Sequence, residues 1–192
     1  MIHHLQEAFK IDTKVRSLPR VQHDGVAWQT DGFNIEVVEF DESYVYEEDD
    51  VRVIPFKVPH HLGSDVPSYG FRVEYGGYSL VISGDTSYSE NLIEFSEGVD
   101  LLIHEVVAAP LEKDLSEGIE FVLSIHTGPE ECGRVFSRVH PKLAVYNHLL
   151  LLKGVTLDEV LERTRREYDG SVIVGEDMMQ IQIGETVKVI NL

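Results

Sequence analysis

Cysteine is almost missing from this chain of 192 residues, which contains only Cys132. A single thiol excludes an internal disulfide and a cysteine-based zinc site, so any bound metal ion must be held by His and Asp. Long apolar runs are missing too, because no segment approaches the roughly eighteen uninterrupted apolar residues of a membrane span. The N-terminus has no basic region followed by an apolar core. We therefore expect neither a membrane span nor a signal peptide, and a cytoplasmic location.

Positive charge is also scarce, with 16 Lys and Arg residues against 34 Asp and Glu residues and a net charge of −18. Such an acidic surface repels phosphate backbones unless basic side chains gather in one place. The basic cluster of the sequence is Arg163, Arg165 and Arg166, in a segment with helical spacing of apolar residues. Pairing with acidic neighbours on an exposed helix face is the simpler interpretation of this cluster. Nucleic acid is therefore the less expected partner.

The remaining composition, with 43% hydrophobic and 26% charged residues, is typical of a globular protein, and we expect one domain over residues 1–192. Apolar residues at helical spacing alternate with short β-rich segments, which predicts an α/β fold. Helices are predicted at residues 2–16, 89–95, from 127 onward and at 157–167. Strands are predicted at residues 34–40, 43–46, 51–58, 68–75, 78–82, 99–105 and 142–146, with a long connection over 106–123.

Asp85 lies in the sequence Ser83-Gly84-Asp85-Thr86, directly after the predicted strand 78–82. A carboxylate in this place has a fixed direction, because the strand is rigid and Gly84 lets the backbone bend close to a site. An ordinary Asx turn closing the strand is the alternative. The histidines on both sides of this stretch favour a site.

Several other ionisable residues follow predicted strands. His60 and His61 follow the strand 51–58, where a surface turn and a ligand site are equally compatible with the spacing. His104 and Glu105 end the apolar strand at 99–105, and two further histidines stand at His126, before a helix, and at His148, after the last strand. Ligands and reacting groups collect at such edges of layered α/β folds. Oxygen and nitrogen donors of these types suit zinc, manganese or iron.

Three smaller features have structural interpretations. Thr127 is a candidate cap for the helix that follows it, which has a proline and two glutamates in its first turn. Cys132 is interpreted as a small packing residue. The acidic residues 47–50 are interpreted as a solvated turn.

Six motifs in order resemble the second half of the metallo-β-lactamase superfamily, in particular its ribonuclease Z and arylsulfatase-like branch. The motifs occupy residues 56–60, 67–72, 83–86, 100–105, 126–131 and 145–148, and residues 168–177 resemble the C-terminal strand and turn of the same branch. Each motif is weak singly, whereas six in the same order are specific. The resemblance spans residues 1 to about 183.

The resemblance implies a site that contains two divalent metal ions, with zinc as the expected metal. His60 would bind the first ion, Asp85 would bridge the two ions and His148 would bind the second. His61 could exchange roles with His60. Two such ions lower the pKa of a bridging water toward neutrality and hold the attacked and departing oxygens. In this chain alone the resemblance implies one ion or none.

Three more residues receive catalytic roles from the same resemblance. His126 would be the general acid that protonates the leaving oxygen. His104 and Glu105 would orient the neighbouring groups. The sequence around His126 reads His-Thr-Gly, where the family has His-Ser-Thr or His-Thr-Ser.

The motif that defines the superfamily, His-x-His-x-Asp-His, does not occur in this sequence. The strands that carry it in the family would precede the helix at residues 2–16. The resemblance therefore predicts a metallo-β-lactamase-like αββα sandwich that is incomplete, with the N-terminal half of the fold absent.

Three interpretations follow for the function. The chain is a truncated metal-dependent hydrolase of an ester bond, either a small ester or a phosphodiester, with impaired activity alone. Alternatively, a second copy or a complementing N-terminal half completes the site. The third interpretation is a non-catalytic module that uses the His and Asp cluster for structure or for regulatory binding. Half a sandwich should expose an apolar sheet face, which favours association.

Overall fold

The computed structural model describes residues 7–11, 14, 37–60, 67–111 and 115–190, and the chain divides into two compact units, Met1–Phe40 and Asp41–Leu192. In the first unit, residues 7–11 and 14 are helical, as predicted, and the rest of the predicted helix 2–16 lies outside the described residues. Residues 37–40 are not in a strand, so this part of the predicted strand 34–40 is wrong. The expectation of a single domain stays a prediction.

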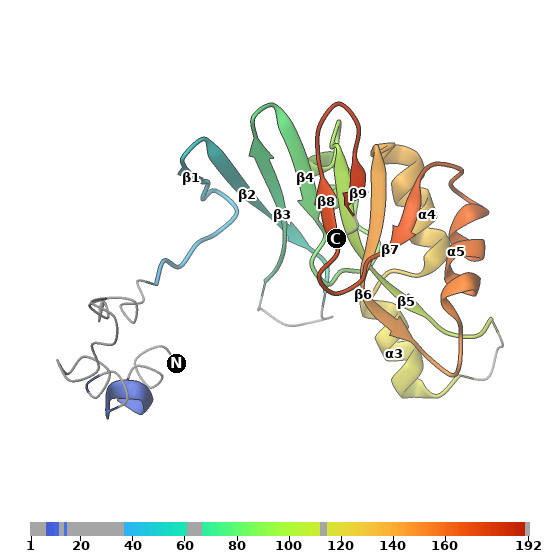
Figure 1. The fold of residues 1–192 in the computed structure, drawn as a ribbon. Helices are drawn as coiled ribbons and strands as arrows, with labels where there is room; N and C mark the ends of the chain where they lie inside the picture. The colour runs from blue at the N-terminus through green and yellow to red at the C-terminus, as the bar shows by residue number, and fades with distance from the viewer. Residues whose placement is uncertain (1–6, 12–13, 15–36, 61–66, 112–114, 191–192) are drawn as a thin grey trace, which may run out of the picture. The chain divides into compact units, whose positions relative to one another are not determined.

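The Asp41–Leu192 unit is built on a seven-stranded sheet in the order β1-β2-β3-β4-β5-β6-β7 (Figure 1). The strands β1 to β4 are antiparallel neighbours, and the strands β4 to β7 are parallel neighbours. Their bounds are β1 Tyr46–Glu48, β2 Val51–Val58, β3 Ser68–Tyr75, β4 Tyr78–Ile82, β5 Leu101–Ala108, β6 Leu143–Leu151 and β7 Val172–Val174. The α/β fold expected from the sequence is confirmed.

Strand β2 forms despite Pro55 in its middle, because β1 pairs only with residues 51–53 of β2. Pro55 lies beyond that pairing, on a stretch where β2 is an edge strand in the described structure. A proline at an edge leaves no ladder hydrogen bond unmade on the open side. The Gly76-Gly77 turn joins β3 to β4, and both glycines have positive φ, as the hairpin prediction requires.

Three helices, α2 Glu90–Phe95, α4 Pro129–Val139 and α5 Leu157–Arg165, pack on one face of the sheet. A fourth helix, α3 Glu117–Ile125, lies between β5 and α4 in the chain. The main core joins Phe56 of β2 and Leu102 of β5 to Leu92 of α2, Phe136 of α4 and Val160 of α5, all of which are almost fully buried. Among the described residues, no helix is long and apolar enough to cross a membrane.

The other face of the sheet is covered in part by a hairpin of β8 Gln180–Gln182 and β9 Lys188–Ile190, which can be followed in Figure 1. Residues Ile181, Ile183 and Val187 of this hairpin region pack on the β5 and β6 side chains of a second, smaller core. On the same face of β2 and β3, Val53 and Val73 pair across the ladder and are only half-buried. The apolar face predicted from the sequence is therefore partly exposed.

The structure corrects several sequence predictions. Strand β5 continues to Ala108 and α3 begins at Glu117, so the predicted connection over 106–123 is largely regular structure. Glu47 and Glu48 are in β1 and not in a turn, because cross-strand pairing with β2 outweighs their low strand propensity. Residues 43–45 are outside that strand, and the β8–β9 hairpin was not predicted.

The arginine cluster on α5 is only partly the exposed face that the sequence indicates. Arg166 makes the expected ion pair with Glu162, four residues earlier. Arg163 instead forms two parallel hydrogen bonds to Glu130 of α4 at 2.8 and 2.9 Å and a third to the Ala109 carbonyl. This half-buried guanidinium joins two helices to the end of β5, and a bidentate contact of this kind is stronger than an exposed pair.

Gly84 is needed for a close approach of two segments. Its φ is +62°, and a Cβ at this position would lie 2.3 Å from the Tyr69 carbonyl oxygen of β3. Gly76 has a similar φ of +58°, but a Cβ there would meet no atom within 4 Å. The two glycines therefore separate the effect of backbone conformation from the effect of crowding.

We predict that Gly84→Ala destabilises the chain more than the matched control Gly76→Ala. In Gly76→Ala the free energy of unfolding should fall by about 1–2 kcal/mol, because a left-handed conformation costs this much for a residue with a Cβ. In Gly84→Ala the free energy of unfolding should fall by roughly 1–3 kcal/mol more, because the added methyl group overpacks the contact with β3. Urea unfolding of both variants measures the difference, and equal losses would contradict the close approach.

Candidate functional site

The candidate residues converge at the carboxyl ends of the parallel strands. Asp85 follows β4, Glu105 lies in β5, and His148 lies in β6 where the strand passes beyond β7. His60 follows β2, and His126 stands between α3 and α4. The Ser87 amide donates to the Pro59 carbonyl over 2.8 Å, so the β2 and β4 ends meet directly.

The Glu105 carboxyl group is the centre of this arrangement and is 1% exposed. Its Oε1 accepts hydrogen bonds from the Thr127 amide at 2.9 Å and the Thr86 amide at 3.3 Å. The same oxygen lies 3.2 Å from Nδ1 of His126, a contact that becomes an ion pair if the imidazole is protonated. One buried oxygen thus binds the segments that follow Asp85 and His126.

The protonation of Glu105 is unusual. Burial raises its pKa from the usual 4.5 to about 8, while the Thr127 and Thr86 amides oppose the shift and the charge of Asp85 adds to it. Its second oxygen, Oε2, is buried without a hydrogen-bond partner among the described residues.

The histidines form a row. The ring centroids of His60 and His126 are 4.8 Å apart, and those of His126 and His148 are 5.7 Å apart. Nδ1 of His60 lies 2.9 Å from the Ile125 carbonyl, which can only accept. Nδ1 of His60 therefore carries the proton, and Nε2 is its lone-pair nitrogen. His61, the alternative to His60, lies outside the described residues.

A β-bulge brings His148 to the end of this row. Glu105 pairs with Asn147 and Val106 with Leu149, so His148 is the extra residue of β6. Its φ is +41°, a left-handed conformation that is uncommon for a residue other than glycine. Bulges redirect side chains near sites, and here Nε2 of His148 lies 3.5 Å from Oδ2 of Asp85. Both side chains are about two-fifths exposed.

His104 lies in the core instead of in the row. It is 1% exposed, its Nδ1 lies 2.6 Å from the Glu105 carbonyl, and its ring packs edge-on against Phe136. Burial lowers its pKa to about 4, so the ring is neutral. Cys132 is fully buried beside it, and burial raises the thiol pKa well above its usual value, which supports the predicted packing role. The orienting role expected for His104 stays a prediction.

Sequence reasoning missed the part played by Thr127. It was predicted to cap α4, but the residue that caps this helix is Gly128, and the Thr127 hydroxyl donates to the Thr86 carbonyl at 2.6 Å. Glu131 accepts from the Gly128 amide at 3.2 Å. In the sequence, a threonine directly follows both Asp85 and His126. This shared pattern is the signal that could have indicated the contact between Thr86 and Thr127.

The metal site expected here is not assembled by the described residues alone. No group of three or more His, Cys, Asp or Glu side chains in that part of the chain is arranged to hold a metal ion. The donor types of His60, Asp85 and His148 suit zinc, and their metal roles stay predictions. The arrangement provides a pair, Asp85 and His148, with the other imidazoles alongside.

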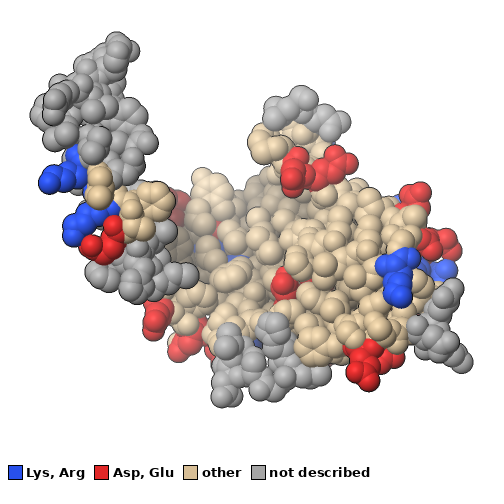
Figure 2. Space-filling model, turned by 90° about the horizontal axis from the view of Figure 1, so that it is seen from below, with Lys and Arg blue, Asp and Glu red and all other residues tan. Residues whose placement is uncertain are grey.

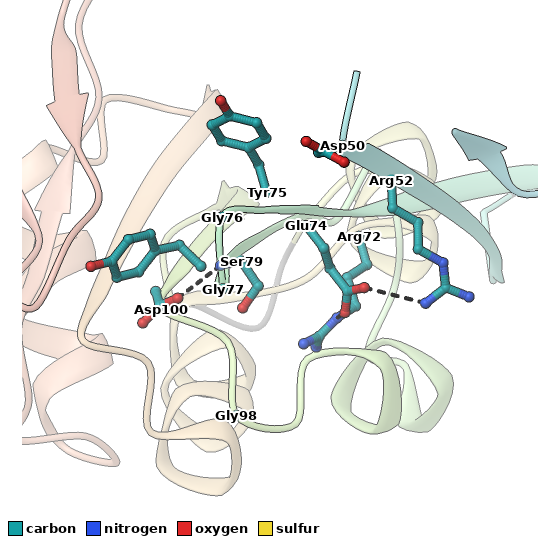
Figure 3. A pocket seen from close by; sticks show the side chains of 11 residues that line it. Asp50, Arg52, Arg72, Glu74, Tyr75, Gly76, Gly77, Ser79, Gly98 and Asp100 are labelled. Atoms are coloured by element: carbon teal, nitrogen blue, oxygen red, sulfur yellow. Dashed lines mark hydrogen bonds and ion pairs between the residues drawn. The ribbon is translucent and has the colours of Figure 1, made fainter. Parts of the chain in front are cut away.

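A hollow lies at the opposite end of the strands from the histidines. Its volume is about 470 Å³, and Gly76, Gly77 and Gly98, which precede β4 and β5, contribute to its lining (Figure 3). Most of its charged groups are paired: Arg52 and Arg72 both bind Glu74, and Asp100 binds the Ser79 amide and Lys142, which lies outside the lining. The hollow is separate from the histidines and contributes nothing to the candidate site.

Figure 2 shows one face of the chain, on which the acidic side chains of residues 41–190 are spread and the Lys and Arg side chains of this unit lie at its margin. On this face, the described residues form no basic patch that could follow a phosphate backbone.

The strain at His148 can be measured. We predict that His148→Gly raises the free energy of unfolding by roughly 0.5 kcal/mol, because relief of the left-handed conformation exceeds the entropic cost of glycine. The exposed contact with Asp85 contributes little. His140→Gly is the matched control, since His140 ends α4 with a φ of +51°. If urea unfolding shows a gain for the control and a loss for His148→Gly, contacts of the imidazole outweigh the strain.

The raised pKa of Glu105 predicts a pH dependence of stability in the metal-free chain. The folded state retains a proton that the unfolded state loses above its pKa of 4.5. The stabilisation of the folded state by this proton on Glu105 is therefore fully present below pH 4.5 and is lost as the pH rises through about 8. Glu105→Gln, which stays neutral, should gain stability relative to the wild type between about pH 5 and pH 8. Urea midpoints after chelator treatment test this, and a constant difference between the two proteins would contradict it.

Comparisons with known proteins agree with this geometry. The sequence model of the beta-lactamase superfamily domain matches residues 4–149. A ribonuclease Z of Mycolicibacterium paratuberculosis is 26% identical over 167 residues, covering 85% of this chain and 52% of the relative. A ribonuclease Z of Mycobacterium tuberculosis is 24% identical over 151 residues, covering 78% and 55%.

Among solved structures, the metallo-beta-lactamase fold protein YhfI from Bacillus subtilis superposes with a TM-score of 0.59 at 22% identity, covering 72% of this chain and 52% of that one. This likeness supports the fold. The chain spans about half the length of the curated relatives it matches. On the sequence match, the chain belongs to the metallo-β-lactamase superfamily, and proteins named ribonuclease Z are among its relatives.

Proposed function

We propose that the chain is part of a metal-dependent hydrolase that cleaves an ester bond. The observation that carries the proposal is the row of His60, His126 and His148 beside Asp85, at the edge where the family places its chemistry. Four residues from separate segments would not gather there for packing alone, since Asp85 and His148 remain exposed.

In this proposal His60, Asp85 and His148 are donors to a divalent metal ion, with zinc as the expected metal. When bound, two such ions supply an activated water and stabilise charge on the departing oxygen. His126 supplies the proton that the leaving oxygen needs, and Glu105 holds its imidazole through Nδ1. The Nδ1 proton of His60 is committed to the Ile125 carbonyl, which fixes the orientation of that ring.

The remaining donors would come from outside these residues. The sequence contains no His-x-His-x-Asp-His string, and its curated relatives are about twice the length of the matched region. We propose that the 192 residues alone have weak metal affinity and impaired turnover. A complementing polypeptide segment or a second copy of the chain would restore both.

A phosphodiester is the proposed substrate class, because the curated relatives are named ribonuclease Z. A small ester is the alternative. The net charge of −18 indicates that this part of the protein contributes the reacting edge and does not bind a nucleic acid backbone over a wide surface.

A second candidate function is a non-catalytic module that keeps half of the metal site. One observation favours it: the described residues arrange no three donors around a common point. The two functions differ in whether zinc-dependent hydrolysis accompanies binding.

The proposal predicts different effects for the donors and the acid. Zinc content by elemental mass spectrometry should approach one ion per chain at saturating zinc, and Asp85→Ala and His148→Ala should each abolish it. His126→Ala should retain zinc and lose hydrolysis of bis(p-nitrophenyl) phosphate. Tyr75→Ala, at the opposite end of the strands, is the control and should change neither.

Equal loss of zinc in all three site variants would contradict the role of His126. Zinc binding that needs Asp85 and His148 without any hydrolysis, in the chain alone or with a complementing segment, would favour the non-catalytic module.

A further inference from the structure

The segments that carry His60, Asp85 and His126 are joined by a closed ring of hydrogen bonds. Nδ1 of His60 donates to the Ile125 carbonyl, and the Ser87 amide donates to the Pro59 carbonyl. The Thr127 hydroxyl closes the ring by donating to the Thr86 carbonyl at 2.6 Å. Each link therefore lies within two residues of a candidate side chain.

Thr127 makes the side-chain link between the His126 segment and the Asp85 segment, and it is neither a donor nor an acid of the proposed chemistry. The Thr86 and Ser87 hydroxyls link the Asp85 segment to the Pro59 carbonyl, each at 3.3 Å. Thr127 is fully buried, and so is Thr86. The direction of the bond from Thr127 is unambiguous, since a carbonyl can only accept. Its backbone is fixed as well, because the amide donates to Glu105 and the carbonyl accepts from the Val107 amide at 3.0 Å.

The geometry explains why a hydroxyl is needed here. His126 and Thr127 are adjacent, as are Asp85 and Thr86, so a bond from Thr127 to Thr86 sets the spacing of the two segments. Glu105 receives one amide from each segment, which holds both against β5. The Thr127 hydroxyl is the bond that runs directly from one segment to the other.

We propose that Thr127 is a positioning residue that fixes His126 relative to Asp85 and His60 through its bond to the Thr86 carbonyl. The inference rests on the proposed function for its consequence, namely turnover, but its structural content can be tested without catalysis. The backbone bonds to Glu105 and Val107 keep the His126 segment on β5, so loss of the hydroxyl should change its spacing from the Asp85 segment and shift both imidazoles of the ring.

The test compares Thr127→Val with Thr127→Ser. Valine keeps the shape and loses the hydroxyl, whereas serine keeps the hydroxyl. Thr164→Val is the matched control, because Thr164 is also fully buried and its hydroxyl bonds to Tyr146 in the core. If Thr127→Val does not fold, Thr127→Ala removes the same hydroxyl without adding a methyl group in its place.

The primary measurement is the side-chain nitrogen–proton correlation spectrum of the histidines in the metal-free chain. The His60 and His126 signals should move in Thr127→Val, return to their wild-type positions in Thr127→Ser and stay in place in Thr164→Val. If a complementing segment restores turnover, kcat on bis(p-nitrophenyl) phosphate should be roughly tenfold or more lower in Thr127→Val than in the wild type, with KM little changed.

Two results would overturn the inference. Histidine signals that move no further in Thr127→Val than in Thr164→Val would make Thr127 a packing residue, and signals that move equally in Thr127→Ser would exclude the hydroxyl as the cause. A wild-type chain without zinc-dependent hydrolysis would contradict the proposed function but leave the spectral comparison readable.

Discussion

One buried carboxyl oxygen connects the parts of this molecule that carry its chemistry. Oε1 of Glu105 accepts from the Thr86 and Thr127 amides and contacts the His126 imidazole. A buried acceptor with two amide donors is strongly oriented, and leaving either amide unpaired would cost free energy. The strand β5 thereby fixes two loops that are otherwise 41 residues apart in the sequence.

The same strand explains the position of His148. The parallel pairing of β5 with β6 is interrupted between Glu105 and Val106, and the residue left over on β6 is His148, with a left-handed backbone. Pairing on both sides of the bulge maintains the strained conformation. Without the bulge, the period-two alternation of the strand would turn this side chain to the other face of the sheet.

The sequence predicts strands β2 to β6, and it places Asp85 after a strand and His126 before a helix, because buried parallel strands are continuous apolar runs with ionisable residues after them. It ends two of these strands too early, since β5 continues past Glu105 to Ala108 and β6 continues past His148 to Leu151. It does not predict the bulge, since Asn147 and His148 carry no pattern that distinguishes a bulge from a strand end. Thr127 was misassigned because a local signal for a helix cap competes with a bond to a distant segment. The β8–β9 hairpin escaped prediction because its strands have three residues each.

The arrangement of charge also limits what this part of the protein can do alone. Asp85, neutral Glu105 and the imidazole row form a compact acid–base cluster, yet the described residues bring no three donors together. Under the proposed function, the missing donors at this edge would come from outside the described residues. Val53 and Val73 on the sheet face are half-buried and leave apolar area exposed. Covering this area with another surface would be favourable, because apolar area is then removed from water. Under the proposed function, a completing segment would supply further donors at the edge and could cover the apolar area that the sheet face leaves open.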